Sequence, residues 1–188
     1  MNAPGDTNRG RLFVISGPSG SGKTTIVSRL RGLPGTYCSV SITSRPPRPG
    51  EVDGSDYHFV SRREFEKMIE RGELAEHARV AGNLYGTPKA PLLEALAAGK
   101  TALVAIDVQG AMQMKESFPA ARLIFIEPPS MEVLEERLRA RRTDSNETVE
   151  RRLSLAAREM EYAPRYDYRI VNDDLERAVT ETKNLVQA

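Results

Sequence analysis

The stretch that decides the fold is residues 17–24, which read GPSGSGKT and follow a short apolar run, RLFVIS, at residues 11–16. The stretch matches the spacing G-x-x-x-x-G-K-[ST], in which glycines let several backbone N–H groups point at one phosphate. Residues 23–31 then have helical spacing, and the positive end of that helix dipole would face the same anion. The sequence therefore predicts a loop that binds a nucleoside triphosphate, without identifying the acceptor.

Working outward, apolar runs alternate with helical patterns along the rest of the chain. Further strands are expected at 37–42, 74–80, 83–85, 101–107, 122–126 and 168–171, and further helices at 61–71, 88–98, 131–141, 147–162 and 175–186. Continuous apolar strands that alternate with helices indicate a parallel sheet covered on both faces. We predict an α/β P-loop fold of three layers, with ligands at the carboxyl ends of the strands.

Composition narrows the classes of function. The chain has 188 residues, 39% hydrophobic and 28% charged, which suits one soluble domain, with residues 1–10 as a disordered tail. No apolar run is long enough for a membrane span, and the start of the sequence lacks a secretory signal. A net charge of +1 argues against binding to nucleic acid. Cys38 is the single cysteine, which fits a reducing compartment, and we expect a cytoplasmic protein.

Residue type and position alone make three side chains candidates for binding phosphate or Mg²⁺. Lys23 can reach the β and γ phosphates, and the Thr24 hydroxyl can ligate Mg²⁺. Asp107 ends a buried apolar run, where a carboxylate often orients Mg²⁺ directly or through water. The alternative for Asp107 is a structural cap of the helix that begins at Val108.

Two further segments carry a resemblance to a known family. Residues 39–60 read SVSITSRPPRPGEVDGSDYHFV and residues 73–87 read ELAEHARVAGNLYGT. Together with GPSGSGKT, they resemble guanylate kinases over nearly the whole chain, from about Arg11 onward. The resemblance implies transfer of the γ-phosphate of ATP to GMP, and to dGMP as well, with Mg²⁺. It also implies a core at 11–36 and 88–188, a small GMP-binding subdomain at about 37–87, and a helical lid at about 137–152.

The resemblance assigns the acceptor site residue by residue. The GMP phosphate would lie against two arginines, whose forks match phosphate geometry, and two tyrosines. These are Arg45, Arg48, Tyr57 and Tyr85, the base pocket is implied at Ser41, Glu76 and Thr87, and Asp107 is a further GMP-binding residue. Glu76 is the informative residue, because a carboxylate can accept from both N1–H and the exocyclic amine of guanine. Adenine would leave it buried and unpaired.

The donor site follows from the same resemblance. ATP would contact the loop and one distant residue: Gly17, Pro18, Ser19, Gly20, Ser21, Gly22, Lys23, Thr24, Thr25 and Asn172. The catalytic cations would be Lys23, Arg45, Arg137, Arg141 and Arg152, and Thr24 and Asp107 would serve Mg²⁺. A turn cap is the alternative for Asn172. The sequence departs from the family pattern at Ala105, usually aspartate, and at Arg142, usually glycine.

Three other functions compete with this interpretation. A guanylate-kinase-like module that binds phosphopeptides would keep the fold, although such modules tend to have a degraded phosphate loop. A P-loop kinase for another phosphorylated acceptor is a closer alternative, and a regulatory GTPase lacks support because no N-K-x-D motif is present. The expected partners are ATP and GMP, with neither nucleic acid nor membrane, and a homodimer stays open.

Overall fold

The computed structural model describes residues 10–80, 82–140 and 146–188. The predicted tail therefore lies almost entirely outside the described residues, as do Arg141 and Arg142. Gly10, which the sequence assigned to the tail, is bonded to the domain, because its backbone N–H donates to the Leu96 carbonyl at 2.9 Å.

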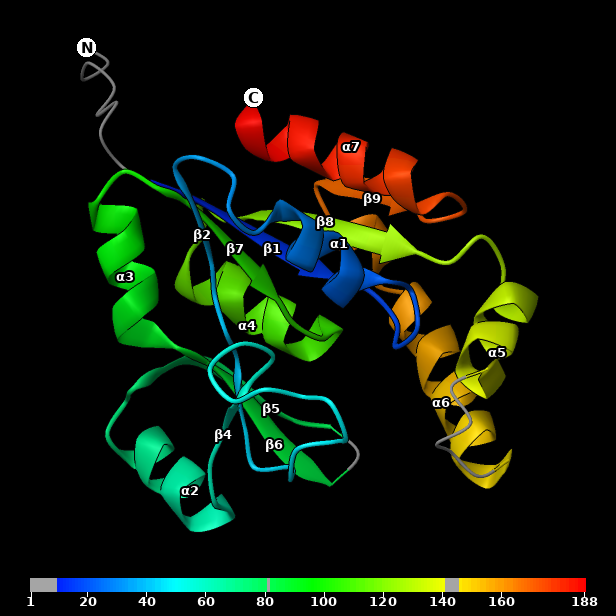
Figure 1. Cartoon of the computed structure of the whole chain (residues 1–188), viewed down its shortest axis with the longest axis horizontal. Helices are drawn as coiled ribbons and strands as arrows, with labels where there is room; N and C mark the ends of the chain where they lie inside the picture. The colour runs from blue at the N-terminus through cyan, green and yellow to red at the C-terminus, as the bar shows by residue number, and fades with distance from the viewer. Residues whose placement is uncertain (1–9, 81, 141–145) are drawn as a thin grey trace.

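A parallel sheet forms the centre of the molecule (Figure 1). In the described part of the chain its strand order is β2 (Thr36–Cys38), β7 (Thr101–Ala105), β1 (Arg11–Ser16), β8 (Arg122–Glu127) and β9 (Tyr168–Val171). Every neighbouring pair in this sheet is parallel. The predicted parallel α/β core is confirmed, with the strand that precedes the phosphate loop at its middle.

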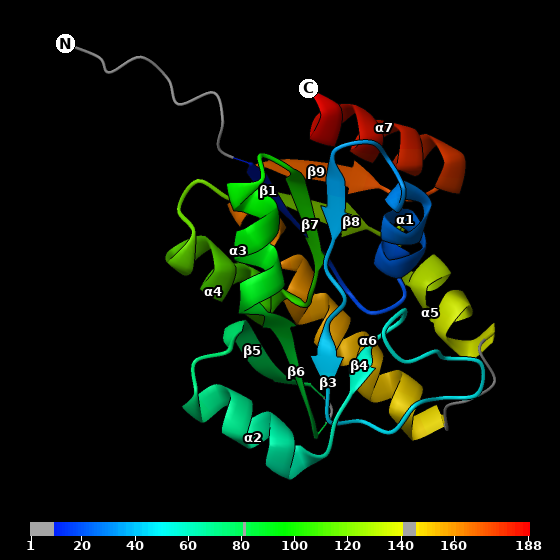
Figure 2. The ribbon, with the colours of Figure 1, turned by 60° about the vertical axis from the view of Figure 1, so that its left-hand side comes forward.

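Helices cover both faces of this sheet, because successive residues of β1 are apolar and point to opposite faces. Phe13 and Ile15 of β1 pack with α1 (Lys23–Leu30) and α7 (Leu175–Gln187), whereas Leu12 and Val14 pack with α3 (Lys89–Ala97) and α4 (Val108–Ser117). Figure 2 shows α1 and α7 on one side of the sheet and α3 and α4 on the other. All four side chains of β1 are at most 6% exposed, which fits a strand buried on both faces.

A second, smaller sheet lies below the first, in the order β4 (His58–Phe59), β3 (Ile42–Thr43), β6 (Asn83–Pro88) and β5 (Leu74–Val80) (Figure 2). The helix α2 (Arg62–Glu70) belongs to this part, and the Ser61 hydroxyl caps it by accepting from the Glu64 N–H at 3.1 Å, as the sequence predicts. Pro88 ends β6 and precedes α3, so it does not lie in the first turn of that helix as predicted.

The prediction of one strand at 37–42 is wrong. The chain leaves the first sheet after Cys38, which pairs with Leu103, and joins the second sheet at Ile42, which pairs with Gly86. A single apolar pattern covers both pieces, but their backbone partners belong to different sheets. The connection between them links the core to the smaller sheet.

Two helices lie beyond the carboxyl end of β8, namely α5 (Met131–Ala140) and α6 (Asn146–Met160) (Figure 1). Leu134 and Leu138 of α5 pack against Val149 and Ala156 of α6 in a small core of their own. A short 3-10 turn (Ala163–Arg165) then leads back to β9. Among the described residues, no helix has the length and apolar character that crossing a membrane requires.

Candidate active site

The phosphate loop is held in shape by the strand before it and by Asn172. The Asn172 side-chain amide is 4% exposed and donates to the Ser21 carbonyl at 2.7 Å. Gly22 has a φ of +98°, and a Cβ there would come within 2.2 Å of the Asn172 amide nitrogen, so only glycine fits. Asn172 therefore supports the loop directly. Neither of its two expected roles, an adenine contact and a turn cap, includes this contact.

Lys23 turns back across the same loop. Its ammonium group donates to the Gly17 carbonyl at 2.5 Å and to the Pro18 carbonyl at 2.9 Å. Thr24 and Thr25 follow on the exposed start of α1, while Pro18 and Ser21 are buried in the loop. The cation is thus positioned where a phosphate bound by the loop would meet it.

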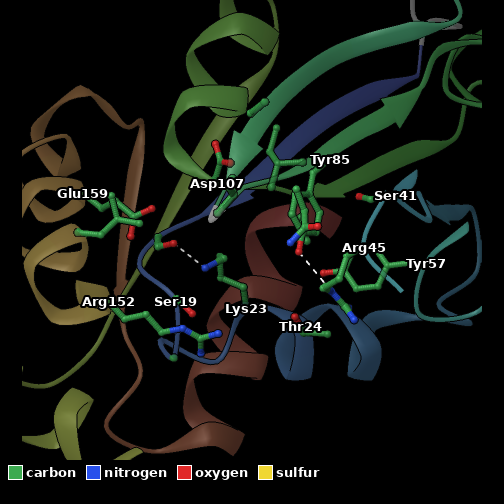
Figure 3. A pocket seen from close by; sticks show the side chains of 18 of the residues that line it. Ser19, Lys23, Thr24, Ser41, Arg45, Tyr57, Tyr85, Asp107, Arg152 and Glu159 are labelled. Carbon is green, nitrogen blue, oxygen red and sulfur yellow. Dashed lines mark hydrogen bonds between the residues drawn. The ribbon is translucent and has the colours of Figure 1, made fainter. Parts of the chain in front are cut away.

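One cavity joins this loop to the second sheet (Figure 3). Its lining includes most of the residues predicted from sequence: Gly17, Ser19, Gly20, Gly22, Lys23, Thr24, Thr25, Ser41, Arg45, Arg48, Tyr57, Glu76, Tyr85, Asp107 and Arg152. Figure 3 shows Lys23 and Asp107 in the middle, Arg45, Tyr57 and Tyr85 on one side, and Arg152 with Glu159 on the other.

Arg45 is the central residue at the end of the cavity next to the smaller sheet. Its guanidinium group lies 5.5 Å from the centroid of the Tyr57 ring and 5.8 Å from that of Phe59. Its Nε donates to the Tyr85 hydroxyl at 3.3 Å. Arg45 is only 9% exposed, whereas Arg48 is exposed at the mouth of the cavity. The arrangement offers a positive charge and two phenols to an anion.

Glu76 is a buried carboxylate that lines the cavity. It is 5% exposed, and its Oε1 accepts a hydrogen bond of 2.7 Å from the buried Thr87 hydroxyl. Burial raises the pKa of Glu76 to about 7, and the nearby Asp107 carboxylate adds to that rise. Ser41 and Tyr85 line the same space. A ligand that donates two hydrogen bonds would satisfy the ionised carboxylate here.

Asp107 caps a helix, which was the alternative role expected from sequence, and its role toward Mg²⁺ stays a prediction. Its Oδ1 accepts from the Gly110 N–H at 2.8 Å and so caps α4, and the residue also lines the cavity. Asp107 and Thr24 offer the hard oxygen atoms that Mg²⁺ prefers. No group of three or more His, Cys, Asp or Glu side chains gathers as a metal site within the described ranges. The donor set therefore fits an ion that draws its other ligands from phosphates and water.

A second hollow lies on the other side of the loop, between Gly20, Gly22, Thr25, Arg137, Asn172, Asp173 and Leu175. Arg137 is fixed there, because its guanidinium donates to the Asn172 carbonyl at 2.9 Å. The structure thus brings Arg137 to the loop and Arg152 to the main cavity. Arg139 is engaged elsewhere, with Glu135, Asn146 and Glu150, as expected for an exposed helix face.

Comparison with known proteins identifies the family. The guanylate kinase family model matches residues 9–188. A guanylate kinase of Gloeobacter violaceus is 56% identical over 177 residues, which cover 94% of this chain and 86% of the relative. The crystal structure of guanylate kinase from Anaplasma phagocytophilum superposes with a TM-score of 0.81 at 38% identity, covering 96% of this chain and 86% of that one.

This chain belongs to the guanylate kinase family. A shikimate kinase from Bacteroides thetaiotaomicron shares 18% identity with a TM-score of 0.50, which shows a common fold alone.

Sequence reasoning missed two carboxylates of this guanylate kinase. Glu159 of α6 lines the main cavity, and its Oε2 is buried without a hydrogen-bond partner among the described residues. Burial raises the pKa of Glu159 to about 7. Glu51 contacts Arg45 directly. The sequence around Glu159 is typical of a solvent-exposed helix face, and Glu51 lies in a charged loop. The sequence pattern therefore did not distinguish either residue from ordinary surface carboxylates.

Proposed function

We propose that this guanylate kinase transfers the γ-phosphate of ATP to GMP through the residues named above, yielding ADP and GDP, and that dGMP is a second acceptor. The observation that carries this assignment is the single cavity shared by the phosphate loop, the Arg45 cluster and Glu76. A triphosphate on the loop and a monophosphate at Arg45 would face each other across it. Glu76 would then select guanine at the far end.

In the reaction, an oxygen of the GMP phosphate bonds to the γ phosphorus of ATP. The bond from that phosphorus to the bridging oxygen breaks, and ADP leaves with the electron pair. The acceptor phosphate has a second pKa of about 6, so it is ionised at neutral pH and needs no general base. The main obstacle is the repulsion between two polyanions, which is why cations gather at the site and no catalytic histidine is expected.

The chain's own residues supply the opposing charge. Lys23 would bind the β and γ phosphates, and Arg45, Arg48, Tyr57 and Tyr85 would hold the acceptor phosphate. Arg137, Arg141 and Arg152 would surround the transferring group when the helical region at about 137–152 closes over ATP and excludes water. Thr24 and Asp107 would hold Mg²⁺, which neutralises charge on the phosphates when bound.

A cytoplasmic location follows from the same proposal. ATP and GMP are cytoplasmic metabolites, and Cys38 is a free thiol in the structure. A reducing compartment would keep that thiol intact.

An acceptor panel tests the proposal. Purified protein is given ATP and Mg²⁺ with GMP, dGMP, AMP, UMP or shikimate, and ADP release is followed by a coupled assay. We expect turnover with GMP and dGMP alone. Equal turnover with AMP or UMP would contradict the role of Glu76, and no turnover with any acceptor would favour the phosphopeptide-binding module.

A further inference from the structure

An internal ion pair holds Arg45 at the acceptor end of the cavity. Glu51 Oε2 accepts from Arg45 Nη1 at 2.9 Å, and Oε1 accepts from Nη2 at 2.8 Å. The two side chains are only 10% and 19% exposed, so the pair is far better shielded than the exposed pairs on helix surfaces. The hydrogen bonds from Arg45 lower the pKa of the Glu51 carboxyl, which keeps it ionised. A bidentate pair of this kind fixes the plane of the guanidinium group.

The guanidinium group of Arg45 presents N–H donors along an end edge and along a side edge, and its hydrogen bonds use the two edges differently. Glu51 occupies the end edge, formed by Nη1 and Nη2, and the other Nη1 hydrogen goes to the Pro46 carbonyl at 2.7 Å. Nε meets the Tyr85 hydroxyl at 3.3 Å. A guanidinium group has five N–H donors. One Nη2 hydrogen, on the same side as Nε, therefore has no acceptor within the described residues, and this side edge lies beside Tyr85 at the cavity.

Glu51 also orders the turn that carries the second arginine. Its Oε2 accepts from the Arg48 N–H at 2.6 Å, and its own N–H donates to the Arg48 carbonyl at 3.0 Å. The carboxylate thus fixes the side chain of Arg45 and the backbone of Arg48 together. Both are residues to which we assign the acceptor phosphate.

We propose that Glu51 is a positioning residue for the acceptor phosphate: it holds the end edge of Arg45 so that the side edge, with the Tyr85 hydroxyl, receives the phosphate of GMP. This inference rests on the proposed function. The opposite role is also chemically possible, since an internal carboxylate can compete with a phosphate for one arginine. The two roles differ in sign. A positioning residue strengthens phosphate binding, whereas a competitor weakens it.

The decisive substitution is Glu51→Gln, which keeps the shape but places an NH₂ group against a guanidinium donor. We expect the KM for GMP to rise about tenfold, equal to about 1.4 kcal/mol. The KM for ATP and the inhibition constant of guanosine, which has no phosphate, should stay within about twofold of wild type. Glu51→Asp, which is one methylene shorter, should restore part of the GMP affinity. Glu66→Gln is the matched control, because Glu66 forms an exposed ion pair with Arg62 in the same subdomain.

Each other outcome overturns the inference. An unchanged or lower KM for GMP would make Glu51 a bystander or a competitor. A parallel loss of guanosine binding would make Glu51 a general structural residue of the subdomain. If Glu51→Gln does not fold, the same comparison is made with Glu51→Asp. Calorimetric binding of GMP without ATP keeps the test separate from the proposed reaction. If wild type binds GMP but does not turn it over, the reaction fails while the comparison of Glu51 variants still stands.

Discussion

At Glu76, a carboxylate that is only 5% exposed has one side-chain hydrogen bond, from Thr87, and room for a ligand beside it. Replacing it by Gln removes one acceptor and adds a donor that faces the donors of guanine. For Glu76→Gln we expect the KM for GMP to rise about thirtyfold, or about 2 kcal/mol, with the KM for ATP unchanged. Steady-state kinetics with each substrate varied would measure this, and the exposed Glu73→Gln serves as the control.

The pKa of about 7 at Glu76 predicts a pH dependence of base binding. In the proposed complex the ionised carboxylate would accept two hydrogen bonds from guanine, so a bound proton would compete with the ligand. The affinity for guanosine should therefore fall as the pH drops below about 7, by about tenfold per unit, and level off above it. Guanosine is the right ligand because it has no phosphate that titrates in this range. Titration calorimetry between pH 5 and 8 would show a flat profile if Glu76 does not contact the base.

Lys23 donates to the Gly17 and Pro18 carbonyls of the phosphate loop. For Lys23→Ala we expect kcat to fall by about 10²–10³, because a preorganised cation at the transferring phosphate is lost. The dissociation constant of GMP, measured by calorimetry, should change by less than about twofold. Near-normal turnover in this variant would remove Lys23 from the catalytic set.

At the scale of elements, the ends of the core strands supply the site. The phosphate loop follows β1, Asp107 follows β7, and Asn172 follows β9. Because these strands are parallel, their carboxyl ends meet at one edge of the sheet. Helix α4 begins at that edge with Asp107 as its cap.

The first turn of α4 also shapes the base pocket. A Cβ at Gly110 would lie 2.5 Å from Glu76 Oε2, so the helix leaves room for that carboxylate only with glycine. Gly110→Ala should improve helix propensity by up to about 1 kcal/mol but displace Glu76. We expect about tenfold weaker GMP binding without loss of thermal stability, measured by calorimetry and thermal melts. Gln109→Ala, at the neighbouring exposed position, is the control. Equal GMP affinity in the two variants would refute the close contact between position 110 and Glu76.

At the scale of the whole molecule, the cavity draws on three parts: the core sheet, the smaller sheet and α6. Their placement depends on a core that holds β1, β7 and β8 between two layers of helices. Phe125 is fully buried in it, with its ring 4.8 Å from that of Tyr166 in an edge contact.

Truncating that ring tests how far stability and function are separate. Phe125→Ala should lower the free energy of unfolding by about 3–5 kcal/mol, because a cavity replaces a buried aromatic side chain. The KM values of the folded fraction should change little, since Phe125 lines neither hollow. Denaturant titration would measure the change in the free energy of unfolding. Val171→Ala is the control, because Val171 is 41% exposed. A loss below about 1 kcal/mol would show that the core repacks.

Much of the architecture followed from local patterns. The strand, loop and helix at residues 11–31 and the cap at Ser61 are local signals, because periodicity and turn chemistry act over a few residues. The strand predicted at 37–42 was wrong for the converse reason, since strand partners are chosen by distant backbone. The roles of Arg141 and Arg142, outside the described residues, remain predictions.

The sequence by itself determined the phosphate loop through a short motif and the parallel core through apolar runs that alternate with helical patterns, and it predicted most of the polar residues that line the cavity. Only the tertiary structure decided how these side chains are oriented. Asn172 supports Ser21, Glu159 enters the cavity from α6, and Glu51 holds one edge of Arg45. These contacts depend on the burial and geometry of whole elements, and a hydrogen bond between elements leaves no periodic trace along the chain.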